Sequence, residues 1–307
     1  MNIIFMGTPD FAAASLKALL ESEIPVKAVF TQPDKPKNRG MKLVASPVKE
    51  LALEHGIPVF QPESMKDPAA EELVRSLEPD LMITAAYGQI LPQGVLSVPG
   101  LGCINLHGSL LPLYRGASPV QSCILNGDTV TGVSVQYMSA RMDAGAVIDS
   151  VSTPIGETES AEELFDRLTV LGAELLCKVV KGFENGPMPA EEQNESLATY
   201  CKKLDKTMSP LDFTRPARLV VKQVCGLYPW PGATMEMNGV VVKVCGAAVS
   251  DAPCGALPGK IVSAGRNGIE VACGDGKSVL ITHLQPPGKK PMDAAAYLAG
   301  HKVAVDG

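Results

Sequence analysis

The chain has 307 residues, of which 46% are apolar and 20% are charged, and its formal net charge is −6. This composition is typical of a globular protein and excludes a chain that is disordered, collagen-like or a coiled coil over its whole length. The length predicts two domains, and the negative net charge argues against a protein whose entire surface binds nucleic acid.

The N-terminal residues and the cysteines indicate a cytoplasmic protein. The start of the chain lacks a basic segment followed by a long apolar one, and no stretch approaches the roughly 18 apolar residues of a membrane span, so we expect neither a secretory signal nor a transmembrane helix. The eight cysteines include no Cys-x-x-Cys pair, and the four histidines are dispersed. We therefore expect reduced cysteines and no metal site.

Strands and helices are predicted to alternate over the first hundred or so residues. Strands are expected around 3–6, 26–30, 59, 81–85 and 103–106. Helices are expected to follow Thr8, Ser46 and Asp67. Each of these polar residues can cap a helix and precedes a proline, which suits the first helical position. This alternation predicts an α/β domain with a Rossmann-like, open, mostly parallel sheet and helices on both faces.

Two further strands are predicted at 134–138 and 147–153, and a long helix follows them. Ser160 and Glu163 form a capping box at the start of this helix, and its apolar stripe ends near Gly182. The segment from Gly186 to Thr199 is rich in proline, glutamate and asparagine and is predicted to be an exposed linker.

The last hundred residues have mostly β character. Three Asn-Gly or Asp-Gly pairs, at 238–239, 267–268 and 275–276, lie beside β-branched runs and predict tight hairpins. One helix is expected near 217–227, and the clearest strands are 240–244, 269–272 and 279–284. We predict a small antiparallel, OB-like β-barrel. The expected division is a first domain at 1–185, a linker at 186–204 and a β-barrel domain at 205–307.

Charge is distributed unevenly between these parts. Residues 1–204 have a balance of −9 and residues 205–307 a balance of +3, while the stretch 34–49 alone carries +4. A basic run of this kind is either a solvated loop or a segment that contacts phosphates.

The densest polar sequence begins at the end of the strand at 103–106. Asn105 and His107 are two residues apart, so a strand places both side chains on one face. An asparagine amide can donate a hydrogen bond to a developing oxyanion, and a histidine can transfer a proton near neutral pH. The first strand, by contrast, ends in Gly7-Thr8-Pro9-Asp10, which is not a dinucleotide-binding sequence.

A carboxylate beside His107 would orient its ring. Asp128, Asp143 and Asp149 all lie near predicted strand ends. Spacing alone does not choose among the three.

The run Asn105-x-His107-Gly108-Ser109-Leu110-Leu111-Pro112, with Arg115-Gly116 after it, resembles the signature of folate-dependent formyltransferases. Other segments resemble the branch of that family that acts on methionyl-tRNA. They are Gly7-Thr8-Pro9-Asp10-Phe11, Thr31 to Pro36 with Arg39-Gly40, Ser46 to Lys49, Ala86-Tyr87-Gly88, Pro229 to Gly232, and Leu284 to Pro286 with Gly288-Lys289-Lys290. The resemblance covers essentially the whole chain.

The resemblance implies transfer of a formyl group from 10-formyltetrahydrofolate to the α-amine of methionyl initiator tRNA. Asn105 would hold the formyl oxygen, His107 would assist proton transfer, and Asp143 would orient His107 and help relay a proton. No metal is needed, no membrane is involved, and we expect a monomer. This chain departs from the family pattern at Ala144 and at Leu113-Tyr114, which flank groups that the chemistry uses.

The resemblance also implies binding residues. Folate would contact Tyr87, Gly88, Ile90, Ser109, Leu110, Leu111 and Pro112. The tRNA would contact Lys35, Lys37, Arg39, Lys42, Lys206, Lys289 and Lys290. Two alternatives stay open: a formyltransferase for a small amine such as a sugar nucleotide, and a non-catalytic RNA- or folate-binding module.

Overall fold

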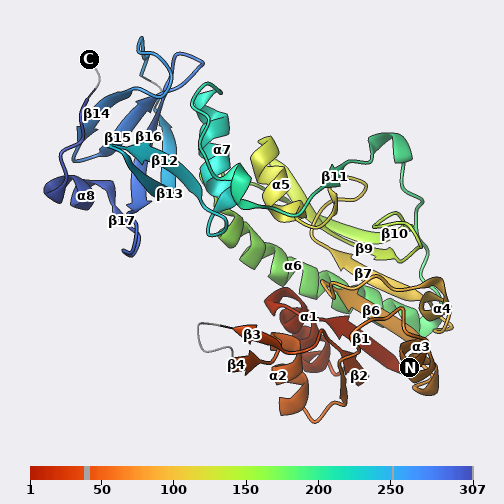
Figure 1. The fold of residues 1–307 in the computed structure, drawn as a ribbon. Helices are drawn as coiled ribbons and strands as arrows, with labels where there is room; N and C mark the ends of the chain where they lie inside the picture. Colours follow the sequence, from red (N-terminus) through yellow and green to blue (C-terminus); the bar gives the residue numbers. More distant parts are fainter. Residues whose placement is uncertain (38–41, 251, 306–307) are drawn as a thin grey trace. The chain divides into compact units, whose positions relative to one another are not determined.

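The computed structural model describes residues 1–37, 42–250 and 252–305, and its elements are drawn in Figure 1. The chain divides into two compact units. The first comprises Met1–Gly116, Gly132–Ser152 and Arg167–Tyr200, and the second Ala117–Thr131, Thr153–Asp166 and Cys201–Gly307. Because each unit draws on several stretches of chain, the linear division at residues 185 and 204 stays a prediction.

A seven-stranded sheet organises the first unit. Its strand order is β10-β9-β7-β6-β1-β2-β5. The strands are β1 (Ile3–Gly7), β2 (Val26–Phe30), β5 (Val59–Phe60), β6 (Leu81–Ala85), β7 (Cys103–His107), β9 (Val130–Tyr137) and β10 (Val147–Pro154). The five strands from β7 to β5 run parallel, whereas β9 runs antiparallel to β7. The predicted Rossmann-like, mostly parallel sheet is confirmed.

Helices cover both faces of this sheet because its strands are apolar on both sides. The helices are α1 (Asp10–Glu21), α2 (Pro47–Glu54), α3 (Pro68–Ser76), α4 (Gln93–Leu96) and α6 (Ala161–Gly182), of which α6 belongs to this unit from Arg167 on. On one face, Ile4 and Met6 share a core cluster with Val74 of α3 and Val95 of α4. On the other face, Gly172 of α6 lies against Leu106. Asn105 and His107 alternate with Leu106 and therefore face the α3 and α4 side.

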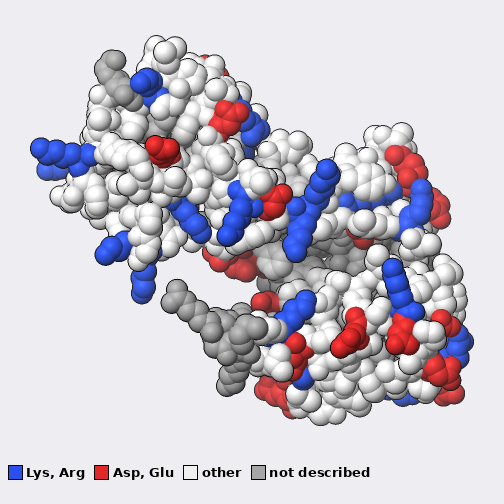
Figure 2. Space-filling view, in the orientation of Figure 1, with Lys and Arg blue, Asp and Glu red and all other residues white. Residues whose placement is uncertain are grey.

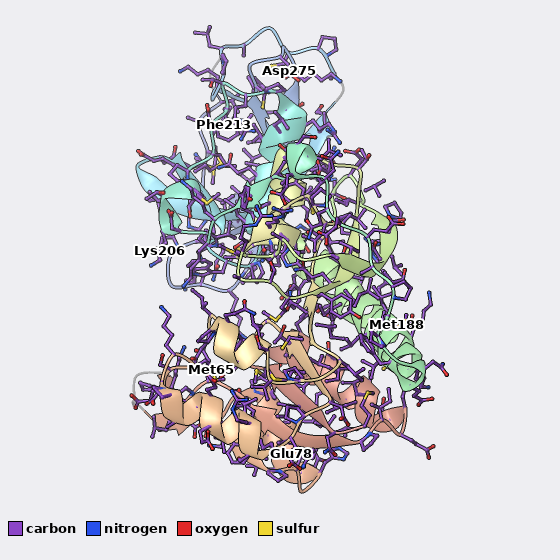
Figure 3. All side chains as sticks on the ribbon, turned by 90° about the vertical axis from the view of Figure 1, so that its right-hand side faces the viewer. Met65, Glu78, Met188, Lys206, Phe213 and Asp275 are labelled. Atoms are coloured by element: carbon purple, nitrogen blue, oxygen red, sulfur yellow. The ribbon has the colours of Figure 1, made fainter. Side chains whose placement is uncertain are left out.

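Short elements complete the first unit. A hairpin pairs β3 (Lys35–Lys37) with β4 (Lys42–Val44). The remaining pieces are β8 (Arg115–Gly116), the 3₁₀ turns η1 (Phe183–Asn185) and η2 (Glu195–Leu197), and β11 (Tyr200–Cys201), whose last residue belongs to the second unit. Met188 lies beside the end of α6 (Figure 3), where its sulfur would be 2.4 Å from a Cβ added to Gly182.

Two of the predicted helix caps are confirmed and one is wrong. Ser46 accepts a hydrogen bond from Lys49 N, and Asp67 accepts one from Ala69 N. Thr8 does not cap α1: Pro9 occupies the cap position, and the Thr8 hydroxyl donates to the carbonyl of Tyr87 instead. The Thr8 hydroxyl and the Tyr87 carbonyl meet at the end of the parallel sheet, so the hydroxyl bonds to this distant carbonyl and not to the backbone of α1. The capping box of Ser160 and Glu163 is present as predicted.

The described part of the second unit contains an antiparallel sheet, several helical elements and the first part of α6. The sheet order is β12-β13-β16-β15-β14, with β17 paired to β16. The strands are β12 (Ala233–Met237), β13 (Val240–Ser250), β14 (Ile261–Gly265), β15 (Gly268–Ala272), β16 (Ser278–Gln285) and β17 (Met292–Asp293). The helical elements are α5 (Pro119–Asn126), η3 (Lys206–Met208), α7 (Ala217–Leu227) and α8 (Ala294–Gly300). This sheet confirms the predicted antiparallel β-domain, and α7 has the predicted bounds.

Two local features explain how these elements connect and pack. Asn238 and Gly239 both have positive φ (50° and 75°) and form the two-residue turn of the β12–β13 hairpin, as the sequence predicts. Helices α5 and α7 approach closely at Gly226, which has no side chain. A Cβ added there would lie 2.8 Å from Leu125.

All eight cysteines are described, and none forms a disulfide. Cys103 and Cys273 are 4% and 2% exposed, and burial raises the pKa of each thiol to about 12. Within the described residues, no helix has both the length and the apolar character that crossing a membrane requires.

Candidate active site

The polar residues at the end of β7 lie beside polar residues of the neighbouring strands. Asn105 is opposite Thr84 of β6 on one side and opposite Gln136 of β9 on the other. His107 is opposite Ser134 and is only 7% exposed. These polar residues therefore come from three adjacent strands of one sheet.

The Asn105 side chain is held by Thr84. The Thr84 hydroxyl is 2.8 Å from Asn105 Oδ1, and it also lies 3.1 Å from the carbonyl of Ile104. When the hydroxyl donates to Oδ1, the amide group Nδ2 of Asn105 is directed away from Thr84. That amide group then has its protons available for an oxygen atom of a substrate.

His107 lies between a carbonyl and a carboxylate. Its Nε2 is 2.9 Å from the carbonyl oxygen of Tyr114, and because a carbonyl can only accept, Nε2 carries the proton in the neutral ring. Its Nδ1 is 3.8 Å from Asp143 Oδ2, which is longer than a hydrogen bond. A proton bound at Nδ1 would face this carboxylate.

The geometry distinguishes Asp143 from the other two candidate carboxylates. Asp128 is 2.9 Å from Asn126 Nδ2, and Asp149 forms an ion pair of 2.7 Å with Lys178. Asp143 is the carboxylate of the three that lies beside His107.

A strained and closely packed loop carries Asp143. Its φ is +50°, a conformation that costs energy for a residue other than glycine. Asp143 Oδ2 accepts from the backbone N–H of Gly116 at 2.9 Å, and Oδ1 is 3.3 Å from Gln136 Nε2. At Gly145 an added Cβ would lie 1.8 Å from the carbonyl oxygen of Tyr137, so the loop requires glycine there.

The sequence analysis did not identify a second layer of polar residues around this loop. Arg115 is fully buried, and Gln193 and Glu195 from the predicted linker bind it. The hydrogen bond from Arg115 lowers the pKa of the Glu195 carboxyl below its usual value, and the same bond raises the pKa of Arg115. An arginine in a motif is a weak signal for such a network, since its partners lie 78 and 80 residues away.

The predicted folate-binding turn at 109–112 is held in place by two serine hydroxyls. Ser109 Oγ donates to the carbonyl of Leu113 at 2.6 Å, and Ser134 Oγ donates to the carbonyl of Ser109 at 2.8 Å. Ser109 is fully buried, so it acts within the turn. Leu110, Leu111 and Pro112 are partly exposed.

The other predicted folate segment, at 87–90, follows β6. Tyr87 is 4% exposed, its hydroxyl has no partner among the described residues, and burial raises its pKa to about 12. Gly88 has a φ of +81°, and Gln32 donates to its carbonyl at 3.0 Å. Ile90 is 73% exposed. Tyr87 thus belongs to the core, whereas Ile90 is available to a ligand.

An open cavity of about 600 Å³ adjoins this segment. It lies beside Gly88 and Ile90 and does not include Asn105, His107 or Asp143. Its lining residues are Gln32, Pro33, Lys35, Glu63, Ser64, Lys66, Gly88, Gln89 and Ile90.

The structure describes the predicted tRNA contacts only in part. Arg39 lies outside the described residues, and Lys37 and Lys42 are described only as paired backbone positions of the β3–β4 hairpin. Lys35 is exposed, and its amine donates to Gln32 Oε1 at 2.6 Å.

The remaining predicted contacts belong to the second unit and are all exposed. Lys206 begins η3 (Figure 3), and Lys289 and Lys290 follow β16 in a turn. On the face drawn in Figure 2, Lys and Arg side chains project from several separate places of the β-domain. Across residues 1–37, 42–250 and 252–305, no group of three or more His, Cys, Asp or Glu side chains is arranged to hold a metal ion.

Comparison with known proteins places this chain in a family. Residues 1–180 match the family model described as formyl transferase, and residues 203–302 match that of the formyl transferase C-terminal domain. The methionyl-tRNA formyltransferase of Trichlorobacter lovleyi is 46% identical over 304 residues, which are 99% of this chain and 95% of that protein. The chain belongs to the methionyl-tRNA formyltransferase family. A member from Methylococcus capsulatus is 45% identical over 99% of this chain and 98% of its own length.

Solved structures agree with this family fold. The N-formyltransferase of Helicobacter canadensis, solved in complex with folinic acid and dTDP-3-aminofucose, has a TM-score of 0.72 at 18% identity and covers 93% of this chain and 99% of its own. The phosphoribosylglycinamide formyltransferase of Streptococcus pneumoniae has a TM-score of 0.51 at 23% identity, over 60% of this chain and 98% of its own. At these identities the likeness concerns the fold.

Proposed function

We propose that this chain transfers the formyl group of 10-formyltetrahydrofolate to the α-amine of methionyl initiator tRNA. The observation that carries the proposal is the assembly of Asn105, His107 and Asp143 at one sheet edge, in a chain that is 46% identical to a methionyl-tRNA formyltransferase over 99% of its length. Each of the three side chains has a chemical property that formyl transfer needs.

In the proposed reaction the amine nitrogen attacks the formyl carbon, a new C–N bond forms, and the bond between that carbon and the folate nitrogen breaks. The Asn105 amide would donate to the formyl oxygen as negative charge develops on it. The amine loses one proton, and the folate nitrogen gains one. His107 Nδ1 is unprotonated in the neutral ring and lies beside Asp143, so this pair would hold the proton in transit.

The residues at the two predicted folate segments fit a flat, partly apolar ligand. Ile90 presents an exposed apolar side chain beside the open cavity, and Gly88 exposes backbone that no Cβ covers. Leu110, Leu111 and Pro112 form the other segment, on a turn that two serines hold. When bound, the folate supplies an activated formyl group. Ser109 and Tyr87 would support these segments from the protein interior.

The charged residues fit a tRNA partner. Lys35, Lys206, Lys289 and Lys290 are exposed, and the +3 balance of residues 205–307 would favour contact with phosphates. Together with Lys37, Arg39 and Lys42, these residues form our proposed tRNA-binding set. Because charged initiator tRNA is used in translation, we place the protein in the cytoplasm. We propose that it acts as a monomer on tRNA and folate.

A formylation assay on the full chain tests the proposal. We expect formyl transfer to charged initiator tRNA and none to a sugar-nucleotide amine. Asn105→Ala and Asp143→Ala should each lower turnover by orders of magnitude while the protein stays folded. Transfer to the sugar nucleotide alone would establish the first alternative function. Binding of RNA or folate with no transfer to either acceptor would establish the non-catalytic alternative.

A further inference from the structure

Arg115 is a fully buried cation whose donors are all engaged. Nε and Nη2 donate to Gln193 Oε1 at 3.1 and 2.8 Å, and Nη1 donates to the Tyr200 hydroxyl at 3.2 Å. The two terminal nitrogens also bind the Glu195 carboxylate at 3.2 and 2.8 Å. A guanidinium stays charged in proteins, and leaving a buried charge without its partners is costly. Arg115 therefore fixes the position of Gln193 Oε1.

The other end of Gln193 reaches the loop that carries Asp143. Gln193 Nε2 is 2.8 Å from the carbonyl oxygen of Asp143 and 2.7 Å from that of Gly145. The orientation of the amide follows from its partners, because the guanidinium only donates and the two carbonyls only accept. Its two protons are shared among these two carbonyls and the more distant Oε1 of Gln136, at 3.1 Å. Gln193 thus holds the backbone on both sides of Ala144.

The backbone next to Arg115 holds the carboxylate of Asp143 from a second direction. Gly116, whose N–H donates to Asp143 Oδ2, directly follows Arg115 in the chain. The backbone N–H of Arg115 in turn donates to the carbonyl of Thr199 at 2.9 Å. Asp143 is therefore held in its unfavourable φ by donors on both its backbone and its side chain.

We propose that Gln193 is a positioning residue: it sets the backbone of Asp143 so that the carboxylate faces His107, and Arg115 is the anchor from which it does so. The segment between the two family-model matches would then be a structural part of the active site. The inference rests on the proposed function for its catalytic consequence, but the positioning itself is independent of the reaction.

Two substitutions at Gln193 distinguish positioning of the Asp143 loop from mere attachment of the 186–204 segment to Arg115. Gln193→Ala removes both contacts, whereas Gln193→Glu keeps an acceptor for Arg115 and removes the donors to the two carbonyls. Glu192→Gln, a change at the neighbouring exposed residue, is the matched control. For full-length proteins in the formylation assay, we expect both Gln193 variants to lower kcat about 10- to 100-fold, as small displacements of reacting groups do. KM for folate and for tRNA should stay within about twofold of wild type, since Gln193 is not among the residues proposed to bind either ligand.

Limited proteolysis measures how readily the Asp143 loop opens, independently of formyl transfer. Arg141 lies in the same loop, and its side chain is 69% exposed although it pairs with Glu195 at 3.0 Å. Trypsin cleaves after arginine when the backbone opens locally. Both Gln193 variants should be cut at Arg141 about 10-fold faster than wild type and the Glu192 variant. Unchanged cleavage, or a Gln193→Glu variant with wild-type kcat, would overturn the inference. If wild type transfers no formyl group, the proposed function fails, and the cleavage rates still decide whether Gln193 holds the loop.

Discussion

The contact between Thr84 and Asn105 makes a testable link between one hydroxyl and catalysis. Thr84→Val replaces the hydroxyl by a methyl group of similar size at a position that is 3% exposed. The substitution leaves Asn105 Oδ1 without its 2.8 Å partner. The amide would then be free to rotate, and its donating group would face the substrate for only part of the time.

The expected magnitude follows from the value of the lost contact. A hydrogen bond of this kind is worth about 0.5–1.5 kcal/mol net, and 1.36 kcal/mol is a factor of ten in rate, so we expect kcat to fall about 2- to 12-fold. Asn105→Ala removes the donor itself and should cost about 100- to 1,000-fold, as the loss of an oxyanion donor does.

Formylation of charged initiator tRNA at saturating folate and tRNA measures this effect. Thr84→Ser is the matched control, because it keeps the hydroxyl and loses only a methyl group, and it should retain at least half of the wild-type kcat. The reasoning would be refuted if Thr84→Ser were as impaired as Thr84→Val, or if Thr84→Val had wild-type kcat.

Three further changes test stability, pH response and RNA binding. Gly132→Ala would place a Cβ 2.1 Å from a backbone carbonyl of β10, so thermal unfolding should show a loss of about 1–3 kcal/mol, and wild-type stability would contradict the packing. The pKa of Asp34 is lowered mainly by its hydrogen bond from Lys49, which stabilises the fold above the ordinary carboxyl pKa and ceases to do so as pH falls through the lowered value. Lys49→Met should therefore raise the Asp34 pKa in an NMR titration and reduce stability at neutral pH; an unmoved titration would argue against the pair. Replacing Lys289 and Lys290 by alanine should weaken tRNA binding and reduce its salt slope by about 2, with folate affinity unchanged, whereas an unchanged slope would exclude phosphate contacts there.

Local sequence patterns predicted the elements whose signals are themselves local. The prolines after Ser46 and Asp67 indicated helix starts, and the Asn238–Gly239 turn indicated a hairpin, because each depends on backbone preferences over a few residues. Thr8 shows the limit of this approach. Its hydroxyl had a plausible local partner, but the fold brought the carbonyl of Tyr87 within reach, 79 residues away.

Of the candidate site, too, local spacing predicts only the part that lies close together in the sequence. Period-two spacing placed Asn105 and His107 together, but choosing Asp143 over the other carboxylates required the resemblance and then the geometry. The role of Gln193 could not be read from its surroundings, which are rich in proline and glutamate and look like a solvated linker. Its contacts to the Asp143 loop span about 50 residues of chain, and no local pattern encodes such a pairing.

The buried cysteines give the protein an internal reporter of unfolding. Cys103 lies in the first unit and Cys273 in the second, and the raised thiol pKa keeps both as unreactive thiols in the native state. A thiol reagent would label Cys201, Cys245 and Cys254 sooner, since they are partly exposed. Mass spectrometry after brief labelling in denaturant would therefore show whether the sheet around Cys103 and the β-domain around Cys273 unfold at the same denaturant concentration or one after the other.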